Sequence, residues 1–108
     1  MLVKDLKAAL SLTPLTNGGD EKEVFGCYCG DLLSWVMSKA KEGDCWLTVM
    51  GNINAVAVAV LTDCACIVLT ENAPLDEDAK KRAELEGVSI FTTEKNAYQI
   101  AAEISKIL

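Results

Sequence analysis

One stretch of the sequence decides the fold: Cys45-Trp-Leu-Thr-Val-Met50, Gly51-Asn52, Ile53-Asn-Ala-Val-Ala-Val-Ala-Val-Leu61 and, after a short break, Ala65-Cys-Ile-Val-Leu-Thr70. The first and last runs are short and apolar, which is typical of buried strands. The middle run is ambiguous, because alternating alanine and valine suits a strand whereas its length and alanine content suit a buried helix. As a strand it would form a hairpin almost without a polar face. As a helix capped by Asn52 it connects two parallel strands, and we therefore predict a helix.

The alternation of predicted strands and helices continues on both sides of this stretch. Upstream, Gly30-Asp31 separates an extended run from a helix that Asp31 is expected to cap and Gly43 to end. Downstream, Pro74 opens a helix that we expect to turn the stem of Arg82 inward. We predict helices over residues 2–10, 32–40, 53–61, 74–86 and 95–108, strands over 45–50, 65–70 and 88–91, and extended pieces at 15–16 and 23–29. The fold class is then α/β: a three-layer sandwich of βα units with a mainly parallel sheet of about four to five strands.

Composition excludes several classes of function. The chain has 108 residues, and we expect residues 1–108 to form a single domain with one core. It has no histidine, so the commonest general base, the commonest metal ligand and every Ser-His or Cys-His nucleophile are absent. Sixteen acidic against ten basic residues, with Arg82 the single arginine, disfavour a nucleic-acid surface. These features predict a protein that is not an enzyme, binds no nucleic acid and needs no cofactor.

Known signals for targeting and for phosphate binding are missing. Charges recur early in Met1–Leu10 and no apolar run of about 18 residues follows, so we expect a cytoplasmic protein that does not enter a membrane. Neither the P-loop motif nor G-x-G-x-x-G occurs in the chain. A kinase or a dinucleotide-dependent enzyme is therefore not expected.

The five cysteines permit two interpretations. They form Cys27-x-Cys29, a single Cys45 and Cys64-x-Cys66. Cysteines in a reducing compartment pack as small hydrophobic side chains, which is the interpretation we prefer. The alternative is a zinc or iron site that uses the four thiols of the two paired motifs, although structural zinc sites favour wider spacing. We predict no metal.

Small and polar residues follow each apolar run of the predicted sheet. The carboxyl ends of parallel strands meet at one edge, where ligands bind and where helix N-termini present free N–H groups. The candidate ligand-binding residues at this rim are Gly30, Asp31, Thr48, Gly51, Asn52, Asn54, Thr70, Glu71, Asn72, Thr92 and Thr93. Turn and cap chemistry also explains residues of these types, so the rim is a hypothesis about a small metabolite.

Several segments, in order, resemble the DRTGG domain. They are Gly26-Cys-Tyr-Cys-Gly-Asp-Leu-Leu-Ser34, Trp46-Leu-Thr48, Asn54-Ala-Val-Ala-Val58, Ala65-Cys-Ile-Val-Leu-Thr70 and Ala83-x3-Gly87-Val, and the resemblance runs from about Leu2 to Ile107. It implies a fold similar to the N-terminal domains of HPr kinase and Mur ligases. Members of the family occur as small separate proteins and as modules of phosphotransacetylases, so the resemblance implies a regulatory module.

The chain departs from the family pattern at its two signature positions. The aspartate-arginine pair should follow the strand ending at Met50, where this chain has Asn52-Ile53-Asn54, and the threonine-glycine-glycine should fall at Thr70-Glu71-Asn72. An arginine would pair with an anion and a diglycine would let backbone approach a ligand. Their replacement argues against phosphate binding.

The leading hypothesis is a regulatory or protein-interaction module that forms a homodimer or docks on a partner enzyme and senses a small metabolite at the rim. The large aromatics Tyr28, Trp35 and Trp46 would favour association if they were exposed, and otherwise belong to the core. A nucleotide or anion sensor and a thiol-metal protein are the alternatives.

Overall fold

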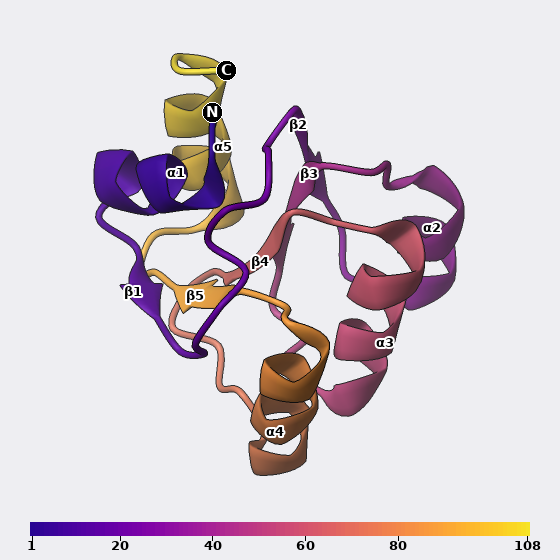
Figure 1. Cartoon of the computed structure of the whole chain (residues 1–108). Helices are drawn as coiled ribbons and strands as arrows, with labels where there is room; N and C mark the ends of the chain where they lie inside the picture. The colour runs from indigo at the N-terminus through magenta and orange to yellow at the C-terminus, as the bar shows by residue number, and fades with distance from the viewer.

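The computed structural model describes residues 1–108 and contains three layers, with a five-stranded sheet in the middle (Figure 1). The strands are β1 (Thr13–Pro14), β2 (Gly26–Cys29), β3 (Asp44–Thr48), β4 (Cys66–Leu69) and β5 (Ile90–Thr92), and the helices are α1 (Val3–Leu10), α2 (Leu33–Lys39), α3 (Ile53–Thr62), α4 (Glu77–Glu86) and α5 (Ala97–Ser105). The order in the sheet is β1-β5-β4-β3-β2. Strands β2 to β5 are parallel and β1 is antiparallel to β5, which confirms the predicted α/β class.

The ambiguous alanine-valine segment is a helix, as predicted. It forms α3, and the side chain of Asn52 caps it by accepting a hydrogen bond from the Ala55 N–H at 2.9 Å. Its buried side includes Val56 and Ala59, which pack against the sheet. Because this segment is a helix, β3 and β4 run parallel as neighbours. None of the helices combines the length and the apolar character that crossing a membrane requires.

Helices cover both faces of the sheet, and strand residues alternate between two cores. Helices α1 and α5 lie on one face and carry the two chain ends, and α2, α3 and α4 cover the other (Figure 1). The core under α1 and α5 contains from the strands Cys45, Leu47, Cys66, Val68 and Phe91. The core under the other three helices contains from the strands Trp46, Ile67, Leu69 and Ile90.

Four local predictions were wrong. Leu32 precedes α2 without a side-chain cap, so Asp31 does not cap this helix. Helix α4 begins at Glu77 instead of Pro74, because the segment before it packs against the β3–α3 loop. The Arg82 side chain is exposed and pairs with Glu86 at 3.4 Å, one turn along the helix. The antiparallel strand is at 13–14 rather than at 15–16.

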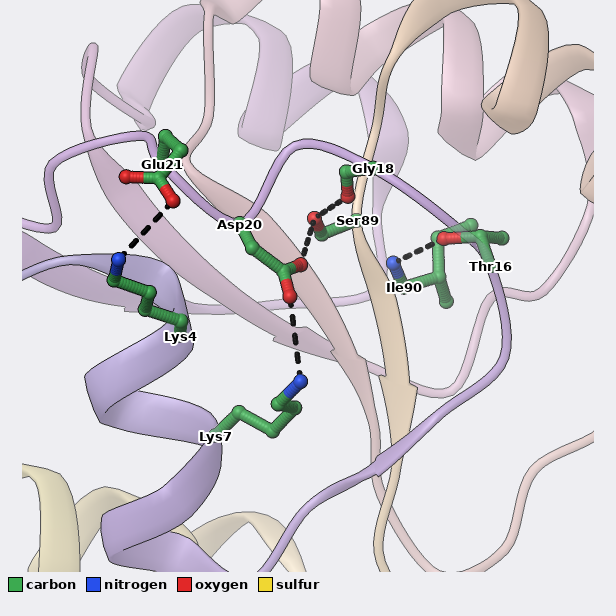
Figure 2. Close-up of polar contacts among 8 residues, drawn as sticks. All are labelled: Lys4, Lys7, Thr16, Gly18, Asp20, Glu21, Ser89 and Ile90. Carbon is green, nitrogen blue, oxygen red and sulfur yellow. Dashed lines mark hydrogen bonds and ion pairs between the residues drawn. The ribbon is translucent and has the colours of Figure 1, made fainter.

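Polar contacts fasten the loop between β1 and β2 to the rest of the molecule (Figure 2). The Thr16 hydroxyl donates to the Val88 carbonyl at 3.0 Å and accepts from the Ile90 N–H at 2.9 Å. The Ser89 hydroxyl donates to the Gly18 carbonyl at 2.5 Å, and Asp20 pairs with Lys7 of α1 at 3.3 Å. These bonds connect α1, the loop and β5, so the predicted turn region is held in place on both sides.

Candidate functional site

A hollow of about 230 Å³ lies at the carboxyl ends of β2, β3 and β4. We call it the rim hollow, and its lining is Cys29, Gly30, Asp31, Leu47, Thr48, Val49, Thr70, Glu71 and Ala97. Five of these residues belong to the predicted set: Gly30, Asp31, Thr48, Thr70 and Glu71. The parallel strands bring them together because the strands end at the same edge of the sheet.

The Asp31 carboxylate joins the ends of two strands. One of its oxygens, Oδ1, accepts hydrogen bonds from the Thr48 hydroxyl at 2.8 Å and from the Val49 N–H at 3.0 Å. The Thr48 oxygen in turn accepts from the Met50 N–H at 3.1 Å. Asp31 therefore holds the segment after β2 against the segment after β3, which gives it a structural role in the wall of the rim hollow.

The side chain of Trp46 contacts the wall of the rim hollow from the core of the protein. Its indole is completely buried, and its Nε1–H donates to the Gly30 carbonyl at 2.8 Å. The Gly30 N–H donates to the Leu47 carbonyl at 3.2 Å. The backbone at Gly30 is thus fixed from both sides, and its polar groups are occupied by the protein itself.

The turn after β4 has an unusual backbone. Glu71 and Asn72 have φ angles of 56° and 54°, and the Ala73 N–H donates to the Thr70 carbonyl at 3.0 Å. Two successive positive φ angles closed by this bond correspond to a type I′ turn, which favours glycine and asparagine. A left-handed conformation costs a residue such as glutamate roughly 1–2 kcal/mol. The chain has here a backbone that glycines would adopt without steric cost, although the residues are glutamate and asparagine.

The N–H groups of this turn are not free for a ligand. The Glu71 N–H donates to the Lys95 carbonyl and the Asn72 N–H donates to the Thr93 carbonyl, each at 2.9 Å. The loop between β5 and α5 thereby fastens the turn. An anion would have to displace these bonds, so the turn does not offer the backbone cradle that a phosphate uses.

The rim hollow is acidic. Asp31 and Glu71 line it, and no lysine or arginine does. Burial, assisted by the nearby Cys27 and Asp31, raises the pKa of the Cys29 thiol to about 11, so this thiol is neutral at physiological pH. Two carboxylates beside a neutral thiol favour a neutral or cationic ligand that donates hydrogen bonds over an anion.

The other predicted rim residues lie elsewhere. A Cβ added to Gly51 would sit 1.9 Å from the Pro74 carbonyl oxygen, so this glycine serves close backbone packing. Asn52 caps α3, and Asn54 lines a groove of about 420 Å³ between α3 and α4. A third hollow, of about 300 Å³ beside Ser11 and Lys95, is lined by three predicted residues, Asn72, Thr92 and Thr93.

Four lining residues were not predicted: Cys29, Leu47, Val49 and Ala97. The first three directly adjoin predicted residues in the sequence, so including the immediate neighbours of Gly30 and Thr48 would have found them. Ala97 lies in the first turn of α5, on the opposite face from the crossover helices. Ala97 reaches the rim hollow through tertiary packing, which no local sequence pattern predicts.

The cysteines do not form the four-thiol metal site considered as an alternative. Cys64 belongs to the core under α2, α3 and α4, whereas Cys66 belongs to the core under α1 and α5. No three side chains among cysteines and carboxylates are placed to hold a metal ion. The regular alternation of side chains between the two faces of the sheet begins only with β4. Cys64 precedes β4, so its thiol and that of Cys66 lie on opposite faces.

Replacing Glu71 by glycine is expected to raise the free energy of unfolding by about 1 kcal/mol, because glycine adopts a positive φ without steric cost. Urea denaturation followed by circular dichroism measures the change. Glu71→Ala is the matched control, since it removes the same carboxylate and keeps the unfavourable backbone, and it should give no gain. An equal gain in both variants would show that the charge, and not the backbone, is the source of the cost.

Comparisons with known proteins identify the family and a structure of similar fold. A family model described as the DRTGG domain matches residues 15–107. One solved structure, the CBS and DRTGG domains of the regulatory region of Clostridium perfringens pyrophosphatase in complex with its activator diadenosine tetraphosphate, is similar with a TM-score of 0.75 and 11% identity. The similarity covers 99% of this chain and 47% of that one, so the chain spans about half of the pyrophosphatase fragment. No curated protein matches the sequence.

Proposed function

The chain belongs to the DRTGG domain family, and on that premise we propose that it is a non-catalytic regulatory domain that senses a small neutral or cationic metabolite in the rim hollow. One observation carries the proposal. The turn at Glu71-Asn72 keeps a glycine-like backbone at the place where the resemblance to the family puts its diglycine, and Glu71 of this turn lines the rim hollow. Strain that persists without glycine is typical of functional segments.

The side chains of the rim hollow suit binding better than chemistry. Asp31 already accepts two hydrogen bonds from the protein, and the Cys29 thiol is neutral. Neither is a poised base or nucleophile. The Glu71 carboxylate is exposed and makes no hydrogen bond or ion pair within the chain, so it is the side chain most able to meet a ligand.

A thermal-shift panel tests the metabolite proposal. A ligand present at a hundred times its dissociation constant adds about 2.7 kcal/mol, which raises the melting temperature of a domain of this size by roughly 10 °C or more. The panel should contain polyamines, amino acids, nucleosides, nucleotides and diadenosine polyphosphates. Shifts are expected with neutral or cationic compounds, and a panel without any shift would refute the proposal.

Two variants locate the binding site. Glu71→Gln removes a charge from the rim hollow and should weaken binding of a cationic ligand about tenfold or more. Glu42→Gln removes the same charge near the opposite end of β3, beside a different hollow, and should leave binding unchanged. Equal weakening in both variants would place the ligand outside the rim hollow.

Nucleotide sensing is the second candidate, and the activator bound to the similar pyrophosphatase region favours it. The two carboxylates of the rim hollow would repel the phosphates of a nucleotide, and the N–H groups of the turn are already hydrogen-bonded within the chain, so both features argue against this candidate. Stabilisation by nucleotides but not by nucleosides in the same panel would favour this candidate over the metabolite proposal.

We also propose that the domain acts in the cytoplasm as a homodimer or on a partner enzyme. Phe25, Trp35 and Leu85 are more than half exposed, and burying such side chains favours association. Trp46, in contrast, is completely buried and contributes nothing to a surface. A light-scattering mass of one chain at high protein concentration would refute the homodimer.

A further inference from the structure

Three cysteines stand side by side across the sheet. Cys27 of β2 pairs in register with Cys45 of β3, and Cys45 pairs with Cys66 of β4. Residues paired in this way lie on the same face of the sheet, on strands about 4.8 Å apart. Cys45 and Cys66 are in the core under α1 and α5, so the three thiols form one row on that face. The proposed metabolite binding makes no use of this row.

The row leads from solvent into the core. Cys27 is exposed because β2 is the edge strand, whereas Cys45 and Cys66 are completely buried. The neighbouring thiols of Cys45 and, to a smaller extent, Cys29 lower the pKa of the Cys27 thiol below its ordinary value, although partial desolvation opposes this effect. The contact with Cys27 raises the pKa of Cys45. The outer thiol is therefore accessible, its thiolate form is favoured, and a second thiol lies beside it on the next strand.

We propose that Cys27 is a peroxide-reactive thiol and that Cys45 resolves its oxidised form as a disulfide between β2 and β3. The Cys27 thiolate attacks hydrogen peroxide, an S–O bond forms as the O–O bond breaks, and hydroxide leaves. Cys27 is then a sulfenic acid, oxidised by two electrons. The Cys45 sulfur attacks the Cys27 sulfur, the S–S bond forms, and the oxygen leaves as water with the proton from the Cys45 thiol.

The register selects Cys45 as the resolving thiol. Disulfides need Cα atoms about 4.4–6.8 Å apart, and the spacing of neighbouring strands falls inside this range. Cys29 also lies on the exposed edge strand, but two residues along a strand place its Cα about 6.5–7 Å from that of Cys27, at or beyond the limit. Cys66 is two strands from Cys27, which puts it out of reach. Oxidation would thus join the edge strand covalently to its neighbour.

The test treats the native protein with stoichiometric hydrogen peroxide. The wild type is expected to lose two of its five free thiols and 2 Da of mass, with peptide mapping assigning a Cys27–Cys45 linkage that dithiothreitol reverses. Cys27→Ser should lower the rate of peroxide consumption at least tenfold. Cys64→Ala is the control, because Cys64 lies in the core on the opposite face of the sheet, and this variant should react like the wild type.

A second variant tests the resolving step. Cys45→Ala removes the buried thiol with little change in volume, and its fold can be checked by circular dichroism. This variant should accumulate a sulfenic acid at Cys27 that dimedone traps, in place of the disulfide. A wild-type linkage to Cys29 or between two chains, or unchanged peroxide consumption in Cys27→Ser, would overturn the proposal.

Discussion

Replacing Trp46 by alanine is expected to lower the free energy of unfolding by about 3–5 kcal/mol, the usual cost of removing a large aromatic side chain from a core. The indole is completely buried among residues of α2, α3 and the sheet. Its Nε1–H also satisfies the Gly30 carbonyl at the wall of the rim hollow. The substitution therefore leaves a cavity and frees a backbone carbonyl at the same time.

Trp35 offers a matched control for this substitution. Its side chain is 63% exposed on α2, so Trp35→Ala should change the free energy of unfolding by no more than about 0.5 kcal/mol. Urea denaturation followed by circular dichroism is suitable because it does not depend on tryptophan fluorescence. Equal losses in the two variants would contradict the assignment of Trp46 to the core and of Trp35 to the surface.

Gly51→Ala is expected to cost about 3 kcal/mol or more, at the upper end of what overpacking costs. The added Cβ would meet the Pro74 carbonyl oxygen at 1.9 Å and the Leu75 Cα at 3.1 Å. Both are backbone atoms, so no side-chain rotation relieves the clash. The Gly51 carbonyl also accepts a hydrogen bond from the Asp76 N–H at 2.8 Å, which any separation of the two segments would break.

Gly26→Ala is the control for this clash. A Cβ at Gly26 would approach only the Asp44 carboxylate, at 2.9 Å, and the end of a side chain can move. We expect a loss of about 1 kcal/mol or less, again from urea denaturation. If Gly51→Ala were as mild as Gly26→Ala, the contact between the β3–α3 loop and the segment before α4 would not be rigid.

The fold was predicted well because the order of apolar runs along the chain is itself a signal. Local propensity left residues 53–61 open between helix and strand, and the choice of a helix capped by Asn52 depended on the alternation of strand and helix that it completes between the runs at 45–50 and 65–70. The strands that follow from this choice are those observed. An extended piece was predicted at 15–16, two residues later than β1, because a two-residue strand containing Pro14 carries almost no pattern.

The site was predicted only in part, since residues at strand ends can serve several purposes. Asp31 and Asn52 look alike as possible caps, yet Asn52 caps a helix and Asp31 joins two strands. Gly51 could have opened the backbone to a ligand, and it instead admits a neighbouring segment of the chain. These outcomes depend on which segments meet in space, and the sequence around each residue does not contain that information.

The bonds of Thr16 have a consequence for the order of folding. Its partners, Val88 and Ile90, lie 72 and 74 residues further along the chain. During synthesis β1 and Thr16 have no partner until β5 has left the ribosome, so this segment must wait for nearly the whole chain. The βα units between β1 and β5 can pair earlier, as each new strand adds to the previous one. Strand β1, although it is made early, is thus among the last elements to pair.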